Sequence, residues 1–208
     1  MLTCKLCLAS PCRPAGQTLG RRLLHCPACG LVFVPDEHWL SVDDERRRYQ
    51  FHDNAPGNAG YRRFLGQVTD VVAALTPRPT SILDFGSGEL AVLTGLLIDR
   101  GHACTAYDPL YGLGSPAGTY NLVILCEVLE HLRDLRGELH ALRGRLARDG
   151  RVLVRTQPYP AVDEIPAWWY SRDSTHINFA APETFTAMLP LLNLTRVERP
   201  ADDLFLLA

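Results

Sequence analysis

The feature that most constrains the fold is an alternation of short apolar strands with helices, which begins near Gly60 and continues almost to the end of the chain. The pattern predicts helices over Tyr61–Leu75, Leu90–Asp99, Glu130–Ala147 and Pro182–Leu192, and strands over Ser81–Phe85, Ala103–Tyr107, Tyr120–Cys126, Arg151–Arg155, Leu194–Glu198 and Leu204–Leu207. Strands that alternate with helices favour an α/β fold, in which helices cover both faces of a mostly parallel sheet. The last two strands follow each other directly, so they predict a C-terminal antiparallel hairpin.

Composition limits the class of protein. A chain of 208 residues with 47% hydrophobic and 21% charged residues suffices for one globular core and a small appendage. The formal net charge of -2 gives no overall attraction for nucleic acid or anionic lipid, so a nucleic-acid partner would need a local basic patch. No stretch reaches the roughly 18 apolar residues of a membrane span, and the N-terminus lacks a secretory pattern. We therefore expect a cytoplasmic protein without a membrane partner, whose thiols stay reduced.

The N-terminus carries two CxxC pairs, with 18 residues between the pairs. Two such turns, joined by a hairpin, bring four thiolates into the tetrahedral arrangement of a structural zinc site. A segment below about 40 residues cannot bury enough core to fold alone, and a metal supplies the missing stability. We predict a zinc ribbon over residues 1–36 with the ligands Cys4, Cys7, Cys26 and Cys29. Four unliganded thiols, or a ligand set that includes Cys12 or His25, are the alternatives. Cys104 and Cys126 lie in apolar strands and are expected to be buried.

The segment from Ile82 to Ala91 joins a strand to a helix through a glycine-rich turn, which is typical of a nucleotide-like ligand site. Gly86-Ser-Gly88-Glu-Leu-Ala91 also fits the dinucleotide pattern, so an NAD-dependent oxidoreductase is one alternative, and an ordinary tight turn is another. Glu89 at the start of the helix would repel a pyrophosphate and suits a ligand that bears an amine. Asp108 follows the next strand, where a carboxylate can accept both hydroxyls of a ribose.

Three motifs in this order, Ile82–Gly88, Tyr107–Asp108 and Tyr120–Leu132, resemble those of class I S-adenosylmethionine-dependent methyltransferases related to the ubiquinone-biosynthesis O-methyltransferases. The resemblance covers roughly residues 60–160 and implies a Rossmann-like fold. It also implies a set of cofactor-binding residues: Gly86 and Gly88 at the methionine part, Asp84 near its ammonium group, Asp108 on the ribose, and Glu127 and Val128 along the border. We add Ser87 in the same turn. Tyr61 and Arg62, near the start of the first core helix, are expected to cover the methionine end. The chain then divides into the ribbon, a linker over residues 37–60 with a helical start near Asp43, and a methyltransferase domain over 61–208.

The sequence departs from this family in two places. Only 12 residues, Pro109 to Tyr120, separate Asp108 from Asn121. This is too short for the usual helix and third strand, so we expect that edge of the sheet to be missing, together with the adenine-binding acid that follows it. Asn121 also stands where relatives usually carry Asp.

Acidic and histidine residues gather after the strand that ends at Cys126. Glu127, Glu130 and His131 would share one face of a helix that began near Glu127. With His176 they resemble the E-x-x-E-H site of small-RNA 2′-O-methyltransferases, in which a divalent ion holds the acceptor hydroxyl, and they form a candidate second metal site. Lining of the pocket without metal is the alternative.

His131 and His176 are the candidate general bases, because a hydroxyl or ammonium acceptor must lose a proton. A satisfied core histidine is the other interpretation of His176. The aromatic run Trp168–Tyr170 predicts either a lid over the substrate or part of the core. We expect methyl transfer to an unidentified small molecule. The alternatives are an RNA 2′-O- or protein methyltransferase that uses the ribbon to bind its substrate, the oxidoreductase, and a binding module without turnover.

Overall fold

The computed structural model describes residues 2–51, 54–76 and 79–208, and it contains a large and a small β-sheet. The α-helices are α1 Val42–Tyr49, α2 Ala59–Leu75, α3 Val92–Asp99, α4 Leu135–Arg143 and α5 Pro182–Leu192. The strands are β1 Arg13–Thr18, β2 Arg21–His25, β3 Val32–Phe33, β4 Ser81–Phe85, β5 Ala103–Tyr107, β6 Tyr120–Cys126, β7 Leu146–Arg155, β8 Asn178–Phe179, β9 Val197–Ala201 and β10 Leu204–Leu207. Short 3-10 helices occur at η1 Asp36–His38, η2 Leu129–His131, η3 Ile165–Ala167 and η4 Trp169–Arg172.

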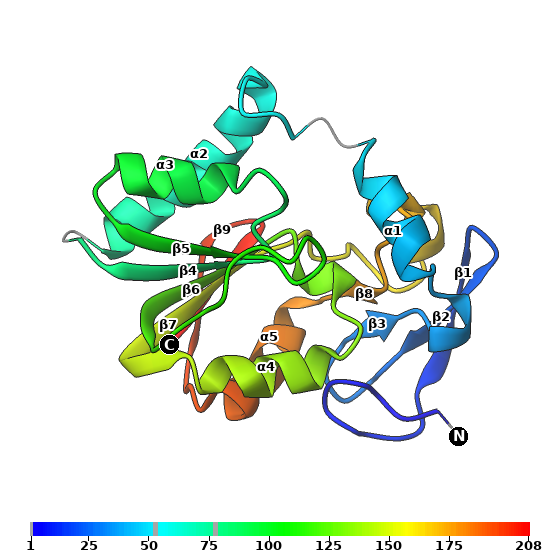
Figure 1. Cartoon of the computed structure of the whole chain (residues 1–208). Coiled ribbons are helices and arrows are strands. Elements are labelled where there is room, and N and C mark those ends of the chain that lie inside the picture. Colours follow the sequence, from blue (N-terminus) through cyan, green and yellow to red (C-terminus); the bar gives the residue numbers. More distant parts are fainter. Residues whose placement is uncertain (1, 52–53, 77–78) are drawn as a thin grey trace.

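The large sheet has the strand order β5-β4-β6-β7-β10-β9. Its first four strands run parallel, whereas β10 pairs antiparallel with both β7 and β9. Helices α2 and α3 cover one face of this sheet, and α4 and α5 cover the other (Figure 1). The predicted α/β fold with a C-terminal antiparallel hairpin is thus confirmed.

Alternate residues along each strand face opposite sides of the sheet, and this alternation builds two cores. Ile82 and Ile124 pack with α2 and α3. Leu83 and Val123, their neighbours in sequence, pack with α4 and α5. Because both faces are covered, the central strands are mostly apolar, which is the pattern that identified them in the sequence.

The sheet ends at β5, as the short connection to β6 predicted. Within the described part of the chain no strand lies beyond β5, and the chain after it folds back so that Leu113 and Gly114 lie against the end of β5. Asp108 and Leu113 pair as an isolated bridge. Gly114 has a φ of 71°, and a Cβ there would lie 2.1 Å from the carbonyl oxygen of Ala106, so only glycine allows this close approach.

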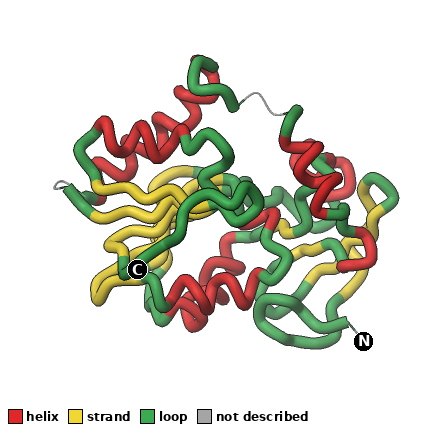
Figure 2. Tube along the Cα trace, viewed as in Figure 1, coloured by secondary structure: helices red, strands yellow, loops and turns green. Residues whose placement is uncertain are grey.

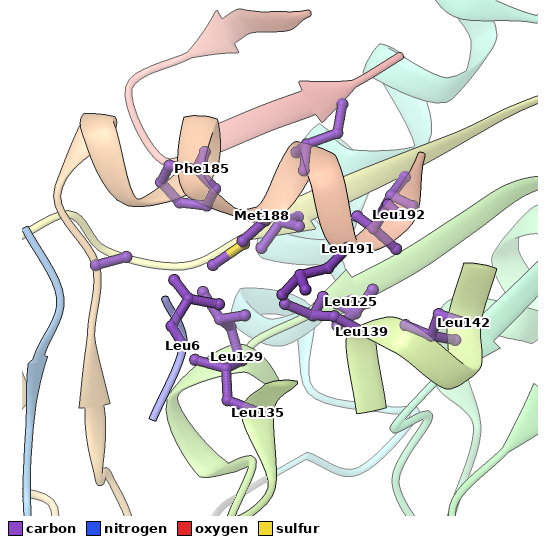
Figure 3. Packing of buried hydrophobic residues seen from close by; sticks show 14 of the residues in the cluster. Leu6, Leu125, Leu129, Leu135, Leu139, Leu142, Phe185, Met188, Leu191 and Leu192 are labelled. Atoms are coloured by element: carbon purple, nitrogen blue, oxygen red, sulfur yellow. The ribbon is translucent and has the colours of Figure 1, made fainter. Parts of the chain in front are cut away.

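The small sheet has the order β1-β2-β3-β8, which joins the N-terminal hairpin to a strand from the far end of the chain. Figure 2 shows the two sheets side by side with helices between and around them. The N-terminal segment also shares the α4–α5 core, because Leu6 is buried beside Leu129 and Leu135 (Figure 3). The division of the chain at residues 36 and 60 stays a prediction. The contacts described here join the N-terminal segment closely to the predicted methyltransferase domain.

Several predicted boundaries were wrong. The helix expected over Glu130–Ala147 is shorter, because the Asp134 side chain accepts a hydrogen bond from Gly137 N and starts α4 afresh. The chain returns to strand at Leu146, which pairs with Tyr120. The first strand of the terminal hairpin begins at Val197 rather than at Leu194. In the predicted linker, α1 begins at Val42, and His52 and Asp53 lie outside the described residues.

Among the described residues, no helix has the length and apolar character that crossing a membrane requires.

Candidate functional site

The glycine turn after β4 has the backbone that the motif predicts. Gly86 and Gly88 have φ values of 73° and 70°, in the left-handed region that favours glycine. The backbone N–H groups of Gly86 and Ser87 both donate to the carbonyl oxygen of Tyr107, which fixes the turn to the end of β5. A Cβ on Gly86 would lie 2.5 Å from Val128 Cγ2, so the turn also sits tightly against the segment after β6.

Asp108, at the end of the neighbouring strand β5, also holds the glycine turn in place. Its carboxylate is buried and accepts hydrogen bonds from Gly88 N and Leu110 N, each at 2.9 Å. The strand-end acid and the glycine turn therefore form one rigid unit.

A cavity of about 720 Å³ opens at the carboxyl ends of β4, β5 and β6. The chain passes from β4 to β5 on one side and then returns to β6 on the other, so the cavity lies at the topological switch point where α/β sheets bind ligands. Of the residues predicted from sequence, those that line it are Tyr61, Gly86, Ser87, Gly88, Asp108, Glu127, Val128, His131 and His176. The glycine turn lies in the same cavity as the two histidines.

Asp84 and Arg62 do not line the cavity. Asp84 is buried in the sheet, where its Oδ2 accepts a 2.7 Å hydrogen bond from Thr94 Oγ1. Burial raises the pKa of Asp84 to about 6. Arg62 is exposed on α2.

Glu127 is held in an unusual way at the end of β6. Its φ of 53° is rare for a residue with a side chain, and such strain is common at functional sites. Oε2 accepts a hydrogen bond from Tyr170 Oη at 3.1 Å, whereas Oε1 is buried without a hydrogen-bond partner among the described residues. Burial raises the pKa of Glu127 to about 7. The left-handed backbone also breaks the helix that was expected to begin here.

Glu130, His131 and His176 come together despite the loss of that helix. Their potential ligand atoms all lie within 4.8 Å of one another, and Glu127 is not part of this group. Glu130 is buried, which raises its pKa well above the usual value, and its Oε1 accepts a 2.5 Å hydrogen bond from Tyr170 Oη. The imidazole rings of His131 and His176 meet edge to face, with centroids 4.8 Å apart.

Both histidines are oriented by backbone carbonyls. His176 Nδ1 lies 2.8 Å from the oxygen of Tyr170, and His131 Nδ1 lies 3.2 Å from the oxygen of Thr175. A carbonyl only accepts, so each of these contacts requires a proton on Nδ1. In the neutral ring Nε2 is then the basic nitrogen.

Helix α1 contributes a wall of the cavity that sequence reasoning missed. Glu45 and Tyr49 line the cavity, yet none of the helix's residues is buried. Ion pairs to distant residues hold the helix: Glu45 with Arg133 and Arg48 with Asp173, each at 2.8 Å. Without an apolar face α1 gave no periodic signal, so only its local helical start could be predicted.

Two residues of the aromatic run, Trp168 and Tyr170, pack in the core, and none of its residues lines the cavity. Tyr170 is buried, and Trp168 packs against Phe179 with ring centroids 6.2 Å apart. Trp169 is about two-thirds exposed.

The four cysteines of the two CxxC pairs meet in one cluster. The Sγ atoms are 3.6 Å apart for Cys4 and Cys29 and 3.5 Å apart for Cys7 and Cys26, and all four lie within 4.8 Å of one another. Zinc–sulfur bonds of about 2.3 Å in a tetrahedron would separate the sulfurs by about 3.8 Å, so the donor set fits a structural zinc ion. Cys12 and His25 are not part of this cluster.

Comparisons with known proteins agree with this geometry. The family model described as "Methyltransferase domain" matches residues 58–198, which is more than half of the chain. A search of the curated proteins found no significant match.

Solved structures share the fold at low identity. A protein from Pyrococcus horikoshii OT3 is 14% identical, with a TM-score of 0.55 over 77% of this chain and 96% of that one. An O-methyltransferase family protein from Burkholderia thailandensis is 18% identical, with a TM-score of 0.57 over 79% of this chain and 59% of that one. The 1,6-didemethyltoxoflavin-N1-methyltransferase of the same organism, solved with S-adenosylhomocysteine, is 16% identical, with a TM-score of 0.52 over 93% and 96%.

The family match covers both the glycine turn and the two histidines. The chain therefore belongs to the methyltransferase-domain family and is an S-adenosylmethionine-dependent methyltransferase.

Proposed function

We propose that this enzyme methylates a small molecule without phosphate groups, and that His131 and His176 receive the proton which the acceptor loses. One observation carries the proposal: the glycine turn and two histidines with basic Nε2 atoms line the same cavity. We call the part at the turn the cofactor end and the part at the histidines the acceptor end. We further propose that the enzyme is related to the ubiquinone-biosynthesis O-methyltransferases, on the motifs of the sequence.

The residues at the turn fit the cofactor. Gly86–Gly88 offer close backbone approach to its methionine part, and Asp108, which is hydrogen-bonded to Gly88 N, lines the same cavity. The buried, unpartnered Oε1 of Glu127 is suited to the cofactor's ammonium group, whereas Asp84 is already bonded to Thr94. We therefore assign the ammonium contact to Glu127 rather than to Asp84.

In the proposed reaction the protein forms no covalent bond to the substrate. The bound cofactor supplies an activated sulfonium methyl group. The walls of the cavity hold the acceptor in line with it and exclude water. Nε2 of His131 or His176 takes the proton from the acceptor oxygen or nitrogen as the new bond to carbon forms.

The charges around the cavity favour a neutral or cationic acceptor. Four carboxylates line it, Glu45, Glu89, Asp108 and Glu127, and of these Glu45 is paired with Arg133. No Lys or Arg lines the cavity among the described residues. A phosphate group would meet repulsion there without a compensating cation. This distribution argues against an RNA acceptor and against the pyrophosphate of a nicotinamide cofactor.

Two metal sites belong to the proposal. Zinc at Cys4, Cys7, Cys26 and Cys29 would have four protein ligands and no open position, so its role is structural. A second divalent ion at Glu130, His131 and His176 is an alternative to direct proton transfer, because the three ligand atoms converge. There it would lower the pKa of an acceptor hydroxyl.

The decisive experiment follows the methyl group. Purified enzyme and methyl-labelled S-adenosylmethionine are incubated with fractionated cell extract, and label is scored separately in small molecules, protein and RNA. We expect label in a small-molecule fraction, and its loss with His131→Gln combined with His176→Gln. Label in RNA or protein alone would overturn the proposed acceptor class. Bound nicotinamide in the purified protein would instead favour the oxidoreductase.

A further inference from the structure

The guanidinium of Arg21, in the N-terminal ribbon, is buried against one loop of the methyltransferase domain. Nη1 donates to the carbonyl oxygens of Ser174 and His176 at 2.9 and 3.0 Å. Nη2 donates to those of Ser171 and Asp173 at 2.9 and 3.0 Å. All four hydrogens of the two terminal nitrogens are therefore used on a single stretch of backbone, residues 171–176.

Four carbonyl oxygens that converge in this way need a cation between them. Their dipoles point at one another, and buried carbonyls without donors would cost free energy. Only arginine presents four hydrogens in a fixed plane, because a lysine ammonium has three and no fork. Arg21 thus determines the path of the loop as well as its stability.

The loop 171–176 carries or contacts each group at the acceptor end of the cavity. His176 belongs to it, and the oxygen of Thr175 orients the ring of His131. Asp173 holds α1 through Arg48.

A second connection runs through the small sheet. β3 of the ribbon pairs with β8, where Phe33 lies opposite Asn178. The Asn178 amide donates to the carbonyl oxygens of Leu129 and Leu132, which flank Glu130 and His131. The ribbon therefore supports both histidines: Arg21 holds the loop that carries His176, and the pairing of β3 with β8 holds the segment that carries His131.

Among the described residues, no hydrogen bond or ion pair joins Arg21 to the turn at Gly86–Gly88. The turn at Gly86–Gly88 is held by Tyr107 and Asp108, which belong to the large sheet. A change at Arg21 should therefore affect the two ends of the cavity differently.

We propose that Arg21 is a positioning residue for the acceptor end of the cavity, through which the ribbon sets the orientation of His131 and His176. The inference rests on the proposed function of these histidines. It also gives the ribbon a role that needs no contact with substrate.

The test combines nuclear magnetic resonance of the histidine rings with cofactor binding. Protein labelled with ¹⁵N in its histidines gives ring signals, which His131→Gln and His176→Gln assign. The variants are Arg21→Met, Arg21→Lys and, as matched control, Arg22→Met, because Arg22 is the exposed neighbour paired with Glu37. Calorimetry gives the affinity for S-adenosylmethionine. Thermal unfolding gives the midpoint of each variant, and the ring spectra are recorded well below the lowest midpoint, so that every protein is folded.

We expect Arg21→Met to lose the hydrogen-bonded Nδ1 proton signal of His176 and to shift the ring signals of His131, with cofactor affinity within about twofold of wild type. Arg21→Lys should give an intermediate spectrum, and Arg22→Met the wild-type spectrum. Unchanged His131 and His176 signals in a folded Arg21→Met protein would overturn the inference, whatever its unfolding temperature. If Arg21→Met does not fold, the same two signals in Arg21→Lys decide. Failure of the wild type to bind S-adenosylmethionine would count against the proposed function instead, and would leave the comparison of ring spectra valid.

Discussion

The backbone N–H of Gly88 donates a 2.9 Å hydrogen bond to Oδ2 of Asp108, so the acid at the end of β5 shapes the turn at the end of β4. The two residues are 20 positions apart in sequence. Asp108 therefore holds the turn, and under the proposed function its remaining acceptor capacity would serve a ribose.

Asp108→Ala should weaken the binding of S-adenosylmethionine by about 1.5–3 kcal/mol, because a charged hydrogen-bonding partner is lost. Asp108→Asn should lose less, since its amide oxygen can still accept from Gly88. Calorimetry on the three proteins measures the difference. Equal affinity in the Ala variant would remove Asp108 from the cofactor site.

Gly86→Ala should destabilise the protein more than Gly88→Ala. Both positions have positive φ, which costs an L-residue about 1–2 kcal/mol. Only at Gly86 does the new Cβ also clash, with Val128 Cγ2 at 2.5 Å, because nothing lies within 4 Å at Gly88. Urea unfolding of the two variants gives their free energies of unfolding, and the difference between them separates the effect of the clash from that of backbone strain. A larger loss for Gly88→Ala would contradict this explanation.

Glu127→Gln should be more stable than wild type above pH 7. Burial raises the pKa of Glu127 from its ordinary 4.5 to about 7, so between these values the folded protein holds a proton that the unfolded chain releases. Stability then falls as pH rises through this window, by on the order of 1–3 kcal/mol, and the amide removes this cost. Unfolding at pH 5 and pH 8 tests the sign: the gain should be present at pH 8 and nearly absent at pH 5.

The affinity for S-adenosylmethionine should rise from pH 6 to pH 8, because the ammonium group binds the ionised form of Glu127. Glu127→Gln should bind more weakly and lose this pH dependence. Asp84→Asn is the matched control, since Asp84 is a buried acid outside the cavity and should leave the dependence in place. If Asp84→Asn flattened the profile instead, the ammonium contact would belong to Asp84.

The purified protein should contain one zinc ion per chain, and Cys26→Ser should lose it and loosen residues 2 to about 35. Cys12→Ser should retain the metal, because Cys12 lies outside the cluster. Cofactor affinity should largely survive in both, since the proposed cofactor residues belong to the domain beyond Gly60. Absence of zinc from protein prepared without chelators would remove the ribbon hypothesis. Zinc that persisted after loss of all four cysteines would point to Glu130, His131 and His176.

The sequence could predict the helices and strands that depend only on the residues within and beside them. The strands β4, β5, β6 and β10 and the helix α5 begin and end at the predicted residues. Each is a short apolar run with turn residues on both sides, and burial on both faces of the sheet requires that composition. The missing third strand could be predicted because twelve residues cannot form a helix and a strand.

The parts that were missed depend on partners far away in sequence. Helix α1 forms a wall of the cavity only because Arg133 and Asp173 hold it. The residues from Glu127 onward have helical spacing, but the chain leaves β6 through a left-handed residue, Glu127, and no helix begins there. Helical spacing correctly grouped Glu130 with His131, yet the backbone that brings them to His176 is a 3-10 turn.

The pairing of β3 with β8 also fixes an order of events during synthesis of the chain. All four cysteines have left the ribosome once Cys29 has emerged, so metal binding can begin early. The carbonyls that receive Arg21 lie 150 to 155 residues further on, so they emerge much later than the cysteines. Closing so long a loop is slow, and until then the ribbon exposes a strand edge and a cation that the native protein buries. We therefore expect the acceptor end of the cavity to form last, well after the cysteine cluster.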